Sequence, residues 1–213
     1  MIDYTLLRSD AIGREIDTLC ATAGRYRFAA VCVNPCWVSR AVSRLSDTDV
    51  KVVTVVGFPL GTSVTDVKAF ETRQAVDAGA QELDVVAPIG HVKEENWSYV
   101  LDDISAVVEA ASGRKVKVIL ETAVLNAELI VKAALICKDA GAHFVKTSTG
   151  FSEKGGATVA AVQLLRRAVG PDMGVKASGG IRDARSAWQM IEAGADRIGT
   201  SSLIVDSAEA HMR

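Results

Sequence analysis

The sequence has few aromatic residues, no long apolar run and no excess of charge of either sign. Phe, Trp and Tyr make up 5% of its 213 residues, and 24 Lys and Arg face 26 Asp and Glu. Nucleic-acid binding needs a basic patch or stripe, so we expect no nucleic-acid partner. No apolar stretch approaches the roughly 20 residues that cross a bilayer, and the N-terminal MIDYTLL lacks a basic segment followed by an apolar one. We therefore expect a cytoplasmic protein with no membrane partner.

Cysteine and histidine are also scarce, and neither forms a pattern typical of a metal site. Four cysteines in a chain of this length do not make a disulfide framework, so we expect all of them to be reduced. Zinc binding by Cys32 and Cys36 is disfavoured because no second pair and no nearby histidine completes four ligands. The three histidines are scattered through the chain. The sequence predicts no metal and no cofactor. The residues concerned are Cys20, Cys32, Cys36, Cys137, His91, His143 and His211.

Short apolar runs alternate with longer amphipathic stretches, which is the pattern of β-α units in a parallel sheet. Helical spacing is clear over 97–111 and 129–140, and Asn126 is placed to cap the second of these helices. No G-x-G-x-x-G follows the first strand, so a dinucleotide-binding fold has no support. We predict an α/β fold, a parallel (β/α)8 TIM barrel that forms a single domain over 1–213. The predicted strands are Ile2–Leu6, Phe28–Val33, Val52–Val56, Leu83–Val86, Val116–Leu120, His143–Thr147, Gly174–Ala177 and Arg197–Thr200.

An internal repeat indicates which residues face the barrel interior. The segments AGAQELDVV, AGAHFVKTS and AGADRIGTS introduce the fourth, sixth and eighth strands. Counted from the first alanine of each segment, Asp84, Lys146 and Gly199 occupy the same position. Alternate strands of such a barrel contribute to a common layer of inward side chains, so we expect these three residues to share one. His143 is an odd step from Lys146 and should point outward, as a histidine without a functional role.

Two lysines end successive strands, Lys146 in FVKTSTG and Lys176 in GVKASGG. Barrel active sites lie at this carboxyl end of the strands. A free lysine, with a pKa near 10.4, is protonated at neutral pH, whereas burial and a second ammonium nearby lower its pKa. One lysine can therefore act as an amine nucleophile while the other stays charged. Asp84 lies at the same level and could move protons through water.

Glycine- and hydroxyl-rich turns follow the last three strands of the predicted barrel. Their backbone N–H groups can approach an anion, and the turns after strands seven and eight commonly form a phosphate site in such barrels. Each turn alone is a weak signal, but three at one side of the mouth predict a small phosphorylated substrate. The candidate phosphate residues are Thr149, Gly150, Gly179, Gly180, Gly199, Ser201 and Ser202.

At these residues the chain resembles the class I deoxyribose-phosphate aldolases. The resemblance runs from IDYTLL through AAVCVNP, VVGFPLG, ELDVV, KVILET, FVKTSTGF and GVKASGGI to RIGTSS, nearly the whole chain. It implies a lyase that cleaves 2-deoxyribose 5-phosphate reversibly to acetaldehyde and glyceraldehyde 3-phosphate. It also implies that Lys146 forms the Schiff base, that Lys176 is the second catalytic lysine and that Asp84 is the proton relay. Polar interior positions of that family match Asp3, Thr5 and Lys117, as supporting residues.

The sequence departs from that family at Tyr4, at Ala87-Pro88 and in the tail LIVDSAEAHMR, and none of these departures removes a catalytic group. Fold alone does not separate this activity from a transaldolase-like aldolase or an isomerase that needs no lysine. A catalytically silent phosphosugar-binding module would be expected to lack a lysine or the aspartate, and none is missing. A metal-dependent aldolase is disfavoured by the scattered histidines. The sequence leaves a homodimer open.

Overall fold

The computed structural model describes residues 1–202, and these form a closed barrel of eight parallel strands in the order β1 to β8. All eight predicted strands are present, with small changes at their ends, so the predicted TIM barrel is confirmed. The predicted extension of the domain to residue 213 and the departure in the tail LIVDSAEAHMR concern residues 203–213, which lie outside the described residues. The strands are β1 (Ile2–Leu6), β2 (Ala30–Val33), β3 (Lys51–Val56), β4 (Glu82–Val86), β5 (Lys115–Ile119), β6 (Phe144–Lys146), β7 (Gly174–Ser178) and β8 (Arg197–Thr200).

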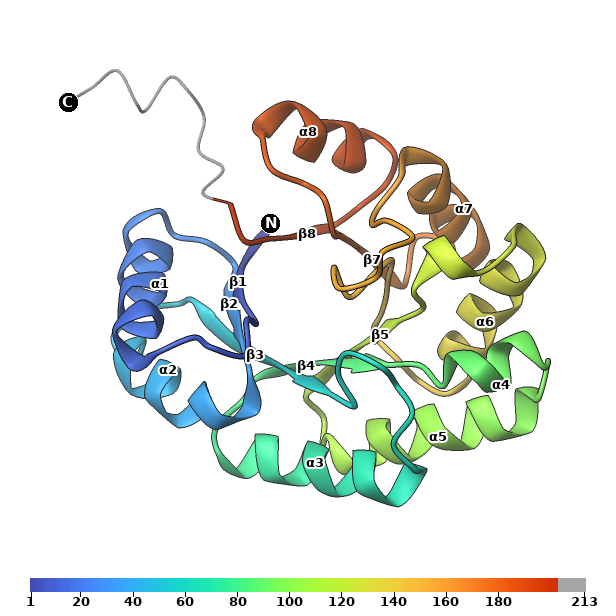
Figure 1. Cartoon of the computed structure of the whole chain (residues 1–213), viewed down its shortest axis with the longest axis horizontal. Helices are drawn as coiled ribbons and strands as arrows, with labels where there is room; N and C mark the ends of the chain where they lie inside the picture. The colour runs from blue at the N-terminus through green and yellow to red at the C-terminus, as the bar shows by residue number, and fades with distance from the viewer. Residues whose placement is uncertain (203–213) are drawn as a thin grey trace.

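The helices lie around the outside of the strands (Figure 1). Asn126 caps α6 as predicted, since its side chain accepts a hydrogen bond from the Leu129 N–H at 2.9 Å. None of the helices in the described part has the length and apolar character needed to cross a bilayer. The helices are α1 (Gly13–Arg25), α2 (Val38–Arg44), α3 (Thr65–Asp77), α4 (Ile89–Lys93), α5 (Trp97–Ala110), α6 (Ala127–Asp139), α7 (Val159–Val169) and α8 (Ala184–Glu192), with short 3₁₀ helices at Pro35–Trp37 and Thr122–Val124.

Two apolar clusters hold the barrel together. The larger one packs the inner faces of the helices against the outward side chains of the strands. The smaller one lies inside the barrel, where β2 and β3 contribute Ala30, Cys32, Val53 and Val55. Every second residue of a strand faces the barrel interior. On β1 and β4 to β8 these inward positions are largely outside the inner apolar cluster. Charged side chains on these strands meet inside the barrel and build the site described next.

Candidate active site

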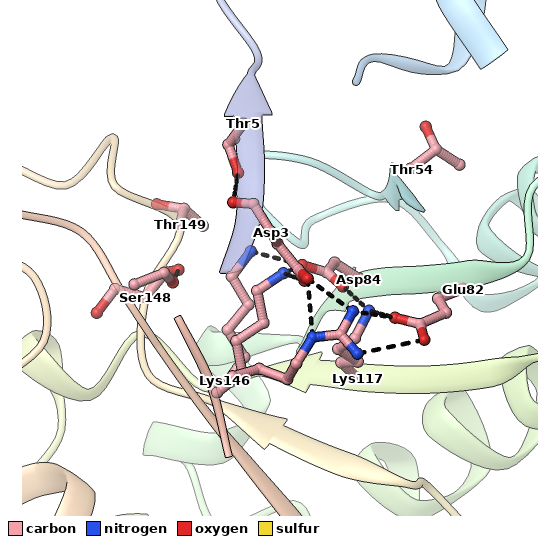
Figure 2. A network of polar contacts seen from close by, with 12 residues as sticks. Asp3, Thr5, Thr54, Glu82, Asp84, Lys117, Lys146, Ser148 and Thr149 are labelled. Atoms are coloured by element: carbon pink, nitrogen blue, oxygen red, sulfur yellow. Dashed lines mark hydrogen bonds and ion pairs between the residues drawn. The ribbon is translucent and has the colours of Figure 1, made fainter. Parts of the chain in front are cut away.

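Three lysines from neighbouring strands converge on the carboxylate of Asp84 (Figure 2). The Nζ atoms of Lys146 and Lys176 each donate to Asp84 Oδ2 at 2.8 Å, and Lys117 Nζ donates to Oδ1 at 2.9 Å. The prediction that Lys146 and Lys176 lie on neighbouring strands is confirmed, since they are paired residues of β6 and β7. Lys146 ends β6, whereas Lys176 lies two residues before the end of β7. Three lysine side chains and one carboxylate thus meet inside the barrel.

Lys146 is the one of these three lysines that reaches open space. It lines a cavity of about 730 Å³ at the carboxyl end of the strands, together with Tyr4 and Thr5 of β1. Lys117 and Lys176 do not line that cavity, and both are fully buried. A substrate in the cavity can therefore touch the Lys146 amine, while the other two lysines act from behind it.

Burial and charge push the two strand-end lysines in opposite directions. Desolvation lowers the pKa of Lys146, and the Lys176 ammonium lowers it further against the opposing attraction of Asp84. The pKa of Lys176 is instead raised: burial opposes the charged form, but Asp3 and Asp84 together outweigh it. The same cations hold the pKa of Asp84 well below its ordinary value despite complete burial. The arrangement favours a neutral amine on Lys146 beside a charged Lys176.

Below Asp84 the interior charges form a closed ring in which cations and anions alternate. Each member contacts two members of opposite sign, at N–O distances of 2.5 to 2.9 Å. Lys146 lies outside this ring and contacts one carboxylate of it, Asp84. In order, the ring is Arg197, Asp3, Lys176, Asp84, Lys117, Glu82 and back to Arg197.

The internal repeat predicted the interior position correctly for its three residues. Asp84 and Lys146 are in direct contact inside the barrel. Gly199 also faces inward, because a Cβ atom built there would lie 3.1 Å from Lys176 Cε and 2.9 Å from Ser178 Cβ. The missing side chain of Gly199 thus leaves room for the Lys176 chain. His143 is exposed and its Nδ1 accepts from the Val116 N–H at 3.3 Å, so it lies away from the interior as expected.

The structure brings six of the seven candidate phosphate residues to the same cavity as Lys146. Ser202 is the exception: it does not line the cavity, and its N–H donates to Thr200 Oγ1 at 3.0 Å. Arg182, which the sequence analysis did not single out, also lines the cavity and forms no ion pair with any residue in 1–202. The six are Thr149, Gly150, Gly179, Gly180, Gly199 and Ser201.

Free backbone donors mark the part of the cavity formed by the glycine turns. The N–H groups of Gly150, Gly179, Gly180 and Ser201 have no acceptor within the described residues. Glycine is required where two of these turns touch, because a Cβ on Gly156 would lie 2.3 Å from the Gly179 carbonyl oxygen. Unpaired N–H groups around an open space are the donors from which proteins build anion sites.

Glu121 is a further buried carboxylate that the sequence analysis missed. It follows β5 with a left-handed backbone (φ 50°), and its Oε2 accepts from the Thr149 hydroxyl at 2.5 Å and the Thr149 N–H at 3.2 Å. Thr149 Oγ1 in turn accepts from the Phe151 N–H at 3.1 Å. Both donors of Thr149 are therefore engaged by Glu121. Glu121 thus fixes the turn that leads from Lys146 to the cavity glycines.

Comparison with known proteins agrees with this geometry. The model of the DeoC/LacD family aldolases matches residues 1–205. The chain belongs to the DeoC/LacD family of aldolases. A deoxyribose-phosphate aldolase from Enterococcus faecalis is 53% identical over 203 residues, which cover 95% of this chain and 92% of the relative. One from an Exiguobacterium species is 56% identical over 202 residues, with 94% and 91% covered.

The family also fits at the level of the fold. A deoxyribose phosphate aldolase from Aeropyrum pernix, described as a unique tetramer, superposes with a TM-score of 0.88 at 36% identity. The match covers 94% of this chain and 85% of that one. Membership of this aldolase family agrees with a reactive lysine at the mouth of the barrel.

Proposed function

We propose that this chain is a class I aldolase that cleaves 2-deoxy-D-ribose 5-phosphate reversibly to D-glyceraldehyde 3-phosphate and acetaldehyde. The observation that carries the proposal is the position of Lys146. It reaches the cavity and has a lowered pKa, while a charged lysine and a shared carboxylate lie behind it. This is the arrangement that a lysine needs to attack a carbonyl group at neutral pH.

The first chemical step forms a covalent bond to the open-chain sugar. The neutral Lys146 amine adds to the C1 aldehyde, and the carbinolamine loses water to give an iminium ion. Asp84 Oδ2 lies 2.8 Å from the Lys146 nitrogen, so the carboxylate can stabilise the new positive charge. The iminium withdraws electrons from C2, which weakens the C2–C3 bond.

The next step breaks that bond. The C3 hydroxyl loses its proton, C3 becomes the aldehyde of glyceraldehyde 3-phosphate, and the electron pair of the C2–C3 bond forms an enamine on C1 and C2. Protonation of C2 and addition of water then release acetaldehyde and restore the Lys146 amine. We assign the proton transfers to Asp84 and Lys176, through water, because both remain hydrogen-bonded to each other beside the reacting nitrogen.

The phosphate is assigned to the glycine turns. The N–H groups of Gly150, Gly179, Gly180 and Ser201, which have no acceptor among residues 1–202, belong to residues that line the cavity, and Arg182 adds a cation to its lining. Gly199 and Ser202 remain candidates from the sequence, and Thr149 would act by shaping the turn. The substrate would then lie with C1 at Lys146 and its phosphate at these turns. This places the anion on the β7 and β8 side, where barrels commonly bind it.

The test is the cleavage of 2-deoxyribose 5-phosphate, followed by the release of acetaldehyde. Lys146→Arg replaces the nucleophilic amine with a guanidinium that stays protonated, so activity should fall by at least about a thousandfold. Lys132→Arg on the exposed face of α6 is the matched control and should behave as wild type. Appreciable activity in folded Lys146→Arg would reject the Schiff-base assignment.

We also propose a homodimer and a cytoplasmic location. The homodimer is supported by exposed apolar side chains at the start of α3, where Val64, Val67 and Phe70 are 50% to 61% exposed. The location is supported by four cysteines that are all free. Light scattering of the wild type and of Val67→Lys/Phe70→Lys tests the dimer: the variant should be monomeric, and a monomeric wild type would reject it.

A further inference from the structure

Four residues of the charge ring have no part in the chemistry described above, and two of them, Glu82 and Arg197, form their ion pairs with ring members other than Asp84 and Lys176. Both are inward residues nearer the amino ends of their strands: Glu82 lies two positions before Asp84 on β4, and Arg197 pairs with Lys176 at the start of β8. Arg197 bridges Asp3 at 2.6 Å and Glu82 at 2.9 Å, and Glu82 contacts Lys117 at 2.8 Å. Neither residue lines the cavity.

The ring has equal numbers of opposite charges. Three cations alternate with three carboxylates, so the ring is neutral when all six side chains are ionised. Each cation of the ring contacts two carboxylates, whereas Lys146 contacts one, and that one is already shared with Lys117 and Lys176. A protonated Lys146 would therefore leave one unmatched positive charge in a buried interior, which is unfavourable. Releasing a proton from Lys146 removes the excess.

We propose that Glu82 and Arg197 are positioning residues that complete a neutral ring and thereby make Lys146, rather than another interior lysine, the group that releases its proton. The proposal rests on the proposed role of Lys146 as the Schiff-base lysine. It extends that role to a pair of side chains that do not line the cavity and whose ion pairs are made within the ring.

The other groups that face Lys146 leave the ring as the dominant source of charge. β2 contributes the Cys32 thiol, whose pKa burial raises to about 11, so it is uncharged at neutral pH. β3 contributes the valines of the inner cluster. Glu121 follows β5 and is occupied by Thr149, while the cavity wall adds Tyr4 and, farther out, Arg8, Arg14, Glu15 and Arg182. The remaining charged groups are the six ring members on β1, β4, β5, β7 and β8.

Removing one ring charge of each sign should have opposite effects. Glu82→Gln leaves an extra positive charge in the ring, which further disfavours the ammonium of Lys146. The pH at which Lys146 becomes reactive should fall by at least about 0.5 unit. Arg197→Met leaves an extra negative charge, so that pH should rise by a similar amount. The double variant restores neutrality, and its midpoint should return to within about 0.3 unit of wild type.

The experiment measures the pH midpoint for reductive trapping of acetaldehyde on Lys146, by intact mass and peptide mapping, in folded variants of the full chain. Arg197→Lys, which keeps the charge, should keep the wild-type midpoint. Asp103→Asn is the matched control, since it removes a buried carboxylate that pairs with Lys68 between α3 and α5. It should leave the midpoint unchanged. If a single variant does not fold, Asp3→Asn and Lys117→Met provide the same pair of opposite charge changes.

The proposal would be overturned if the pH midpoints of both single variants shifted in the same direction or if neither shifted. A merely structural role of Glu82 and Arg197 predicts a lower adduct yield without midpoint shifts of opposite sign. A double variant that keeps a displaced midpoint would overturn it as well. If the wild type forms no adduct on Lys146 at any pH, the proposed function itself fails. If the wild-type adduct forms and the midpoints do not separate, the ring proposal alone fails.

Discussion

Replacement of Lys176 by leucine tests how strongly a neighbouring cation depresses the pKa of Lys146. Both Nζ atoms lie 2.8 Å from the same oxygen, Asp84 Oδ2, so they are at most 5.6 Å apart. Two unit charges at that distance repel by about 3 kcal/mol at an effective dielectric constant of about 20. This repulsion disfavours the ammonium form of Lys146 and so lowers its pKa, and one pKa unit corresponds to about 1.4 kcal/mol.

Without Lys176 that depression disappears, and Asp84 holds the Lys146 ammonium more firmly. The acid limb of kcat/KM should move to higher pH by about two units, and activity at pH 7 should fall by about a hundredfold or more. Adduct formation with acetaldehyde should recover as the solution is made alkaline. Lys176→Arg is the control: it keeps the charge and should keep the acid limb near its wild-type position, even where the rate is reduced.

The measurement is a pH series of cleavage rates and of adduct yield for wild type, Lys176→Leu and Lys176→Arg. A folded Lys176→Leu protein whose acid limb coincides with that of the wild type would refute the electrostatic reasoning. Loss of activity at every pH, with no recovery in alkali, would mean instead that Lys176 serves only in proton transfer.

Three further substitutions test the phosphate site, the Glu121 contact and the charge of Asp3. Ser201→Asp places a carboxylate among the N–H groups of the proposed phosphate site. The ratio of phosphorylated to unphosphorylated deoxyribose cleavage should therefore fall at least about tenfold, while acetaldehyde still forms its adduct on Lys146. An unchanged ratio would mean that the phosphate binds elsewhere. Glu121→Gln weakens the hydrogen bonds that hold Thr149. KM for the phosphorylated substrate should rise several-fold, equivalent to about 1 kcal/mol, with little change in adduct formation by acetaldehyde. An equal loss of substrate binding and of adduct formation would contradict this. The pKa of Asp3 is lowered from 3.8 to about 2, so its charge stabilises the fold by about 2 kcal/mol above pH 4. This stabilisation is lost as the pH falls towards 2. In urea unfolding, the free energy of unfolding of Asp3→Asn should therefore decrease less on acidification than that of the wild type.

Much of the barrel could be predicted from the sequence because the Val-rich strands and the amphipathic helices have distinct spacings. The repeat that introduces β4, β6 and β8 also placed Asp84 and Lys146 correctly, since equal steps along equivalent strands reach the same side of a barrel. Local signals of this kind depend on residues that are close together in the chain. They therefore survive without knowledge of the tertiary structure.

The charge ring could not be predicted in the same way. Its contacts join residues far apart in sequence, such as Asp3 and Arg197, which meet only because β8 pairs with β1 and closes the barrel. A signal was present in the alternation of charged and apolar residues in ELDVV and KVKVI, which is unusual for strands buried on both faces. Glu121 gave no such signal, because its role depends on a left-handed backbone and on Thr149 in the turn after β6.

Reductive trapping of acetaldehyde is the most direct test of whether Lys146 forms the Schiff base. Wild-type protein is incubated with acetaldehyde at neutral pH, reduced with borohydride, weighed intact and mapped by peptide mass. We expect one ethyl group per chain, on Lys146, because the lowered pKa favours a neutral amine there and that amine reaches the cavity. An adduct chiefly on Lys176 or Lys117, or no adduct at all, would contradict it.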